Sequence, residues 1–187
     1  MQEIQITLNN GLFPFKLNDL LSYHYADYHL QNVFESITEE QRQACVNMWL
    51  RNKVIPTAQA AYERSKQVCY FITEASSGEL IGVNTLYVDQ FQTNSPPLFF
   101  NRIFIKPKHR TSRIMITGTA MMLCFAKMKL EDRGISGVVN VNENPKLSRP
   151  GMHRIFSRLG YRRQGYQNGQ EVLYFEFAKI NFLDTSK

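Results

Sequence analysis

The stretch that decides the fold runs from residue 98 to residue 130 and reads LFFNRIFIKPKHRTSRIMITGTAMMLCFAKMKL. Its first eight residues, LFFNRIFI, are rich in aromatic and β-branched side chains, which is typical of a buried strand. A basic turn, KPKHR, follows at 106–110, and from Ile114 onward apolar residues recur at the spacing of a mostly enclosed helix. The rest of the chain is interpreted outward from this order of strand, basic turn and helix.

Upstream of residue 98, the sequence changes from helical to strand periodicity. VCYFITE at 68–74 and LIGVNTLYV at 80–88 flank a Ser-Ser-Gly turn, which predicts an antiparallel hairpin. Earlier in the chain we expect a strand over 3–8, a loop at 11–14 and a helix over 18–34. Thr38 and Gln41 form a capping box that opens a helix to about residue 52, and Pro56 and Thr57 begin a short helix.

Downstream of residue 130, Gly134 ends the long helix and GVVNVN at 137–142 predicts a strand. A helix with core spacing follows and is closed by Gly160, and a last hairpin turns about Asn168-Gly169. The order of all these elements predicts an α+β fold with one mixed central sheet flanked by helices.

Composition excludes several classes of protein. A chain of 187 residues with 43% hydrophobic and 20% charged residues suits one compact globular domain. Three dispersed cysteines favour a reducing compartment, and without a signal sequence or a run of about 20 apolar residues we expect a cytoplasmic protein with no membrane partner. The four histidines are too dispersed to indicate a metal. The hydrolase elbow, phosphate-loop and dinucleotide motifs do not occur.

Charge is distributed unevenly along the chain. Residues 102–163 contain fourteen of the 22 Lys and Arg residues and three of the 16 acidic residues, which gives this segment a net charge of +11. The remainder carries −5, so the overall charge is +6. Such a segment either presents solvated helix faces or binds an anionic ligand.

The run from Ile103 to Arg163 resembles the core of the GNAT superfamily of N-acetyltransferases. Ile105-Lys106-Pro107 is similar to the Val-x-Pro end of the family's strand, and residues 110–115, RTSRIM, are similar to its Arg-x-x-Gly-x-Gly phosphate-binding turn. Arg113 and Met115 hold the two glycine positions, so this motif is degenerate. Residues 156–161, FSRLGY, resemble the aromatic-x-Lys/Arg-x-Gly-Phe/Tyr ending of the helix after the family's fifth strand.

The resemblance implies a single GNAT-like domain over 1–187, with a strand and acceptor-side helices in 1–67 and the core sheet with the acyl-CoA-binding turn in 68–180. It implies an acyl-CoA-dependent N-acyltransferase, with acetyl-CoA or another acyl-CoA as co-substrate, whose acceptor amine attacks the thioester directly. In this family the strand before the turn splays from its neighbour, so its main chain pairs with pantetheine. The residues that correspond to the CoA site are Ile103, Phe104, Ile105, Arg110, Thr111, Ser112, Arg113, Ile114, Met115 and Phe156.

Candidate groups for proton transfer are few. Phe156 stands where the family often has a phenolic acid, and it carries no proton. Asn142, Ser148 and Tyr161 are candidates to orient the thioester or to donate a proton, and Glu143 is a candidate base. Each also has an ordinary structural role, as a turn former, a cap, a packing residue or a surface charge.

Three alternatives stay open from the sequence. The basic segment would also suit a GNAT-like enzyme that acts on nucleic acid. Loss of the glycines and of the tyrosine would suit a catalytically inactive GNAT-like module that only binds. Residues 152–155, MHRI, are similar to a Met-x-Arg-Ile ending of acyl-homoserine-lactone synthases, but Phe99 stands where the glutamate of those enzymes would be.

Overall fold

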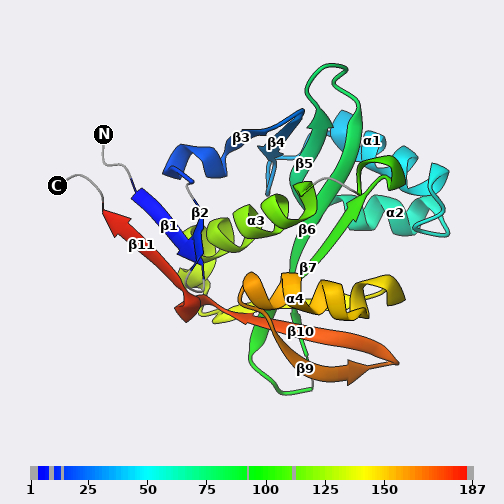
Figure 1. Ribbon diagram of the computed structural model, residues 1–187. Helices are drawn as coiled ribbons and strands as arrows, with labels where there is room; N and C mark the ends of the chain where they lie inside the picture. The colour runs from blue at the N-terminus through cyan, green and yellow to red at the C-terminus, as the bar shows by residue number, and fades with distance from the viewer. Residues whose placement is uncertain (1–3, 9–10, 14, 92, 111–112, 185–187) are drawn as a thin grey trace. The chain divides into compact units, whose positions relative to one another are not determined.

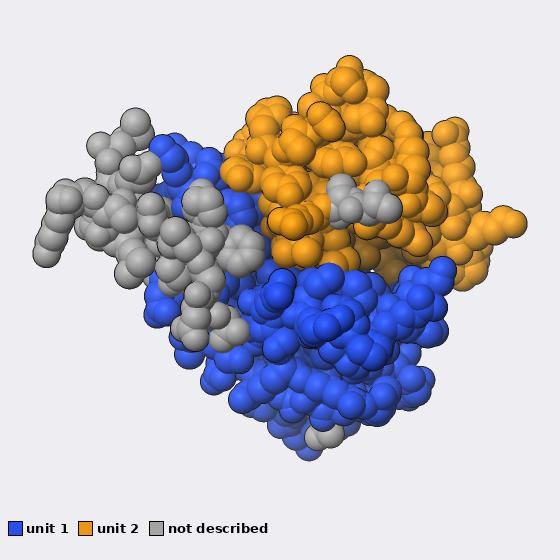
Figure 2. Space-filling model, in the orientation of Figure 1, with its two compact units in different colours: residues 1–20, 87–102, 120–187 blue, residues 21–86, 103–119 orange. Residues whose placement is uncertain are grey.

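The computed structural model describes residues 4–8, 11–13, 15–91, 93–110 and 113–184. These residues form two compact units, which Figure 2 colours separately. Unit 1 comprises residues 1–20, 87–102 and 120–187, and unit 2 comprises residues 21–86 and 103–119. Two strands and one helix of the chain pass from one unit into the other.

Eight strands form a mixed sheet, which confirms the predicted fold class. In sheet order they are β3 (Ser22–Tyr25), β4 (Tyr28–Asn32), β5 (Val68–Glu74), β6 (Leu80–Gln90), β7 (Pro97–Ile105), β8 (Gly137–Asn142), β10 (Gln170–Glu176) and β9 (Arg162–Gln167). β7 pairs with β8 in parallel, whereas β8 and β9 each pair with β10 in antiparallel fashion. A second sheet has the order β11 (Ile180–Asp184), β1 (Ile4–Leu8) and β2 (Gly11–Phe13).

In unit 2, two helices cover part of the sheet: α1 (Glu39–Arg51) and α2 (Ala58–Ser65) (Figure 1). Thr38 caps α1 through the predicted capping box, because its hydroxyl accepts from the Gln41 amide while the Gln41 side chain accepts from the Thr38 amide. Trp49 of α1 is 2% exposed and belongs to a core cluster that includes Val68 and Val83 of the sheet. Burial of this face explains why both helices form.

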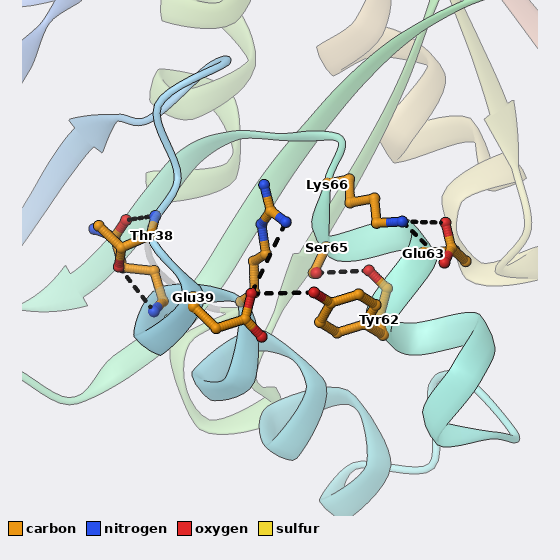
Figure 3. Close-up of polar contacts among 8 residues, drawn as sticks. Thr38, Glu39, Tyr62, Glu63, Ser65 and Lys66 are labelled. Atoms are coloured by element: carbon orange, nitrogen blue, oxygen red, sulfur yellow. Dashed lines mark hydrogen bonds and ion pairs between the residues drawn. The ribbon is translucent and has the colours of Figure 1, made fainter.

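Polar contacts also join the two helices (Figure 3). Tyr62 of α2 donates from its hydroxyl to Glu39 Oε2 of α1 at 3.1 Å. Within α2, Lys66 and Glu63 form an ion pair of 2.8 Å, and Ser65 Oγ donates to the Tyr62 carbonyl oxygen at 2.6 Å. The predicted helices over 38–52 and from Thr57 are therefore confirmed.

The segment before α1 differs from the prediction. Residues 11–13 form strand β2 instead of a loop, and the helix predicted over 18–34 is replaced by a short 3₁₀ turn at Leu17–Leu20 and by the β3–β4 hairpin. The apolar spacing in 20–28 fits either structure locally. Pairing of β4 with β5 decides the outcome, because the two strands are hydrogen bonded from Tyr28–Glu74 to Asn32–Tyr70.

In unit 1, α4 (Pro150–Arg158) lies against β10, and Gly160 follows it with a φ of 95° (Figure 1). The hairpin from β9 to β10 turns at Asn168 and Gly169, as predicted, with φ values of 50° and 77°. The second strand of this hairpin, β10, ends at Glu176, and a 3₁₀ turn at Phe177–Lys179 leads into β11.

Helix α3 (Ile114–Leu130) is the long helix that the sequence predicts. Residues 117–126 are all buried, so the helix is enclosed along its middle, as its many apolar residues indicate. Among the described residues, no helix combines the length and the apolar character needed to cross a membrane.

The three cysteines, Cys45, Cys69 and Cys124, are free thiols with no accessible surface. Burial disfavours the charged thiolate, so it raises the pKa of Cys45 to about 12 and raises the pKa of Cys69 and of Cys124 above the ordinary range. None of these thiols is a nucleophile in the folded chain.

Candidate active site

Residues 103–115, from the end of β7 to the first turn of α3, belong to unit 2 and include nine of the ten residues predicted to bind CoA. Thr111 and Ser112 lie outside the described residues. Arg113 is exposed, Ile114 is fully buried and Met115 is half-buried in the first turn of α3. Met115 has an ordinary helical backbone, so a side chain in place of the family's second glycine requires no positive φ here.

Two bases of this turn share one acid. Lys106 Nζ lies 2.7 Å from Glu79 Oε1, and Lys108 Nζ lies 3.2 Å from Glu79 Oε2. The hydrogen bond from Lys106, then the one from Lys108, and the charges of both lysines hold the pKa of Glu79 down to about 2. One carboxylate offsets only one of the two lysine charges, so the turn keeps a net positive charge, to which its two arginines add.

Arg110 is fixed at the end of β7. Its Nε donates to the Ile105 carbonyl oxygen at 2.8 Å, and its guanidinium carbon lies 5.7 Å from the centre of the Phe104 ring. These contacts use one of the five N–H donors of the guanidinium and leave the two terminal NH₂ groups with no partner among the described residues. Such a planar pair of donors suits a phosphate.

The second polar cluster lies in unit 1 and is centred on Glu171 of β10. Glu171 is only 1% exposed and stands directly opposite Asn142 of β8. Asn142 Nδ2 donates to Glu171 Oε2 at 2.9 Å, and Ser148 also hydrogen bonds to the Glu171 carboxylate. Burial raises the pKa of Glu171, but the hydrogen bonds from Ser148, His153 and Asn142 and the charge of His153 outweigh it and hold that pKa below its usual value.

His153 of α4 is held by the same carboxylate. Its Nε2 lies 3.0 Å from Glu171 Oε2 and 2.9 Å from Glu171 Oε1, while its side chain is 40% exposed. A carboxylate only accepts hydrogen bonds, so Nε2 carries the hydrogen and the lone pair of the neutral ring is on Nδ1. Arg163 Nε, at 3.4 Å from Glu171 Oε1, completes the charges around the acid. Among the described residues, no cluster of side chains suits a metal ion.

Asn142 contributes an unsatisfied acceptor. The Glu171 carboxylate fixes which end of the amide is nitrogen, because only the NH₂ can donate to it. Asn142 Oδ1 is then buried with no hydrogen-bond partner within the described part of the chain, and the residue is 3% exposed. A buried acceptor without a partner costs about 1–3 kcal/mol, so a ligand N–H would stabilise it.

Asn142 lies beside the point where β7 and β8 stop pairing. Their parallel register runs from Phe99 opposite Val138 to Asn101 opposite Asn140. β8 continues for two further residues, and β7 continues to Ile105. The described β7–β8 pairing therefore ends at Asn101, before the segment 103–105 that the resemblance assigns to pantetheine.

Other predicted site residues lie in different surroundings. Phe156 and Tyr161 are 2% and 5% exposed and their rings meet edge to face. Burial raises the pKa of the Tyr161 phenol far above its ordinary value, so this group holds its proton. Glu143 forms an exposed ion pair with Arg102 at 2.7 Å. The described contacts therefore join Asn142 and Ser148 to the Glu171 cluster and give Phe156 and Tyr161 packing roles.

Sequence reasoning missed the two central members of this cluster, Glu171 and His153. The residues are eighteen positions apart, and no local motif joins them. One signal was present, because an acid stands at position 171, at the start of an otherwise largely apolar strand and two residues after the Asn168-Gly169 turn. Placing it opposite Asn142 required the strand register, which the sequence alone did not fix.

Comparison with known proteins gave no matching family model and no matching curated protein. Solved structures do match. The ribosomal-protein-S5-alanine acetyltransferase from Vibrio fischeri is 12% identical, with a TM-score of 0.54 over 89% of this chain and 98% of that one. An acetyltransferase (GNAT family) from Bacillus anthracis is 9% identical, with a TM-score of 0.55 over 84% and 99%. The spermidine N-acetyltransferase from Vibrio cholerae, in complex with CoA and spermine, is 14% identical, with a TM-score of 0.55 over 83% and 98%.

Proposed function

The chain has the fold of the GNAT superfamily, and from this premise we propose that it is an acyl-CoA-dependent N-acyltransferase. In the proposed reaction, the nitrogen of an acceptor amine attacks the thioester carbonyl of acetyl-CoA or a longer acyl-CoA. The carbon–nitrogen bond forms, the carbon–sulfur bond breaks, and CoA leaves as the thiol. The acceptor is an amine, the class to which the spermine bound in the Vibrio cholerae structure belongs.

The observation that carries the proposal is the end of the β7–β8 pairing at Asn101 and Asn140. The main-chain groups of β7 past this point are the ones that would pair with the amides of pantetheine. In unit 2, β7 then leads to Arg110 and the start of α3. The amides at the start of a helix of seventeen residues attract a pyrophosphate, and Arg110 supplies charge-assisted donors in place of the missing glycines.

Binding of CoA is the first test. Acetyl-CoA at ten times its dissociation constant would stabilise the chain by about 1.4 kcal/mol, which a thermal melt detects. We expect acetyl-CoA and CoA to raise the melting temperature, and adenosine to raise it less. A chain whose melting temperature is unchanged by millimolar acetyl-CoA would contradict the proposed function.

Arg110→Ala tests the phosphate assignment. We expect it to weaken CoA binding by about 10- to 100-fold, because a hydrogen bond to a charged group contributes about 1.5–3 kcal/mol. Titration calorimetry gives the dissociation constant independently of any change in stability from the lost Ile105 contact. Arg51→Ala is the matched control, since it removes one exposed positive charge from the same unit. Equal affinities in the two variants would refute the assignment.

A second candidate acceptor is nucleic acid, and one observation favours it. Four exposed bases in and just before α4 form no ion pair among the described residues: Lys146, Arg149, Arg154 and Arg158. Phosphate contacts made by such bases weaken steeply as salt rises. The test measures how much of an RNA hairpin the immobilised chain retains. A decrease in retention between 50 and 200 mM salt, and a further decrease in the Arg154→Ala/Arg158→Ala double variant, would support this acceptor. Retention that ignores salt would exclude it.

A further inference from the structure

The histidine on α4 has the geometry of a base that is held in place by a buried acid. We propose that His153 Nδ1 accepts the proton of the acceptor amine, that Glu171 is the positioning residue which fixes the ring, and that Asn142 Oδ1 accepts a hydrogen bond from the same amine. The inference rests on the proposed function, because it assigns the proton transfer of that reaction.

The contacts of His153 with Glu171 fix the tautomer of its neutral ring. Both oxygens of Glu171 lie within 3.0 Å of His153 Nε2, and the carboxylate is buried while the ring is 40% exposed. The hydrogen of the neutral ring is therefore on the buried side, and the basic nitrogen is on the other edge. Nδ1 has no hydrogen-bond partner among the described residues, so it is available to a ligand.

Glu171 holds both His153 and Asn142. Asn142 Nδ2 and His153 Nε2 both donate to Glu171 Oε2, at 2.9 and 3.0 Å. One carboxylate oxygen thus fixes both side chains, and each has one unused acceptor, Oδ1 on the asparagine and Nδ1 on the histidine. Two acceptors and no donor suit a group that brings N–H bonds, as an amine does.

The position of Asn142 in the sheet relates this cluster to the proposed acyl-CoA site. Asn142 ends β8, two residues after the last described pair between β7 and β8. In the fold to which this chain is similar, the opening of these two strands is where the acyl-CoA is expected. His153 lies on α4, and the Glu171 carboxylate joins it to Asn142 at this end of β8.

The proton balance is simple. The amine nitrogen forms a bond to the carbonyl carbon, the carbon–sulfur electron pair leaves with sulfur, and one proton passes from nitrogen to His153 Nδ1. The same proton then returns to the CoA thiolate or to solvent, so no oxidant, reductant or metal takes part. A protonated His153 would be inactive in this role, so the rate falls at low pH.

Other charges surround this ring and bear on that pH dependence. Glu171 reaches it from β10 and Arg163 approaches Glu171 from β9, while on its own helix Arg149 lies one turn before it and Arg154 follows it. The pH profile is therefore measured in each variant and is not taken from an isolated histidine.

The test uses the whole chain and does not depend on activity alone. In ¹⁵N imidazole spectra above the titration of His153, we expect Nε2 to be protonated and Nδ1 to be bare, with the signal assigned by its loss in His153→Gln. Glu171→Gln should abolish this tautomer preference. A wild-type His153 with its hydrogen on Nδ1, or a preference that survives Glu171→Gln, would overturn the proposal.

The kinetic arm measures CoA release from acetyl-CoA with spermine, L-lysine or an alanyl peptide as acceptor. We expect His153→Gln to lower kcat about 100-fold and to remove the acidic limb of the profile, and Glu171→Gln to lower kcat about 10-fold with KM for acetyl-CoA unchanged. His24→Gln, which replaces an exposed histidine of unit 2, is the control and should retain the wild-type kcat and the acidic limb of the pH–rate profile.

The outcomes separate this inference from the proposed function. If His153→Gln keeps the wild-type rate and the acidic limb, the proton assignment is wrong although the acyltransferase stands. If the wild type binds CoA but releases no thiol with any of the three acceptors, the proton assignment is also overturned, because there is no amine transfer for His153 to assist. If CoA does not bind at all, the proposed function fails first.

Discussion

Glu171→Ala is expected to lower the free energy of unfolding by about 3 kcal/mol at neutral pH. The substitution leaves the amide of Asn142 and the hydroxyl of Ser148 without their buried acceptor, and it opens a cavity at a residue that is 1% exposed. Removal of one member of a buried charged cluster costs far more than removal of an exposed charge, because the remaining groups lose their partner inside the protein.

The sign of the pH dependence follows from the direction of the pKa shift. Hydrogen bonds hold the pKa of Glu171 below its value in the unfolded chain, which is about 4.3. The stabilisation from the carboxylate is therefore present above that value and is lost as the pH falls through the lower folded value. We expect the difference between wild type and Glu171→Ala to be full at pH 7 and to shrink below about pH 4.

Urea denaturation at a series of pH values measures this difference. Glu176→Ala is the matched control, since Glu176 lies on the same strand but is 42% exposed and reaches Arg162 only at 3.6 Å. An exposed pair of this kind contributes about 0–1 kcal/mol, so the control should stay within that range. Equal losses in the two variants would show that the buried network does not stabilise the chain.

Gly82→Ala is the other substitution that we expect to lower the free energy of unfolding strongly. A Cβ at position 82 of β6 would lie 2.5 Å from the Phe104 carbonyl oxygen and 2.5 Å from Ile105 Cδ1. Ile105 Cδ1 is the end of a flexible side chain, but the Phe104 oxygen belongs to the backbone of β7, so the strand itself would have to shift. Overpacking of this kind costs about 3 kcal/mol. The same shift displaces the segment that precedes Arg110, so CoA binding should weaken too.

Gly118→Ala is the control for this substitution. Gly118 lies in α3, where an added Cβ would meet Leu30 Cδ2 at 3.5 Å and Ile72 Cδ1 at 3.6 Å, which are ordinary contact distances. Alanine is favoured over glycine within a helix by about 1 kcal/mol, so this variant should lose no stability. A chain that tolerates Gly82→Ala as well as Gly118→Ala would contradict the close approach of β6 and β7.

The comparison of sequence and structure shows which signals are local. Thr38 with Gln41 and Thr57 marked helix starts correctly, because a capping interaction involves residues three apart. Residues 18–34 were predicted wrongly as a helix, because the β3–β4 hairpin depends on β5, which lies more than thirty residues later. The spacing of apolar residues within a short segment carries no information about a strand partner more than thirty residues away.

The same division applies to the candidate site. Arg110 and Asn142 are site candidates that the sequence suggests, because each occupies a definite place at the end of a strand or in a turn. His153 was noticed but had no partner within ligand spacing, and Glu171 was not identified. Their association depends on the register of β8 with β10 and on the docking of α4, both of which are tertiary features.

The buried cysteines have a practical consequence for these experiments. A thiolate-selective reagent reacts only with an accessible, ionised sulfur, and in the folded chain all three protein sulfurs are enclosed and protonated. The colour that such a reagent develops during turnover therefore counts released CoA without background from the enzyme. Added in denaturant, the same reagent reports three new thiols per chain, so one chromophore follows both turnover and unfolding.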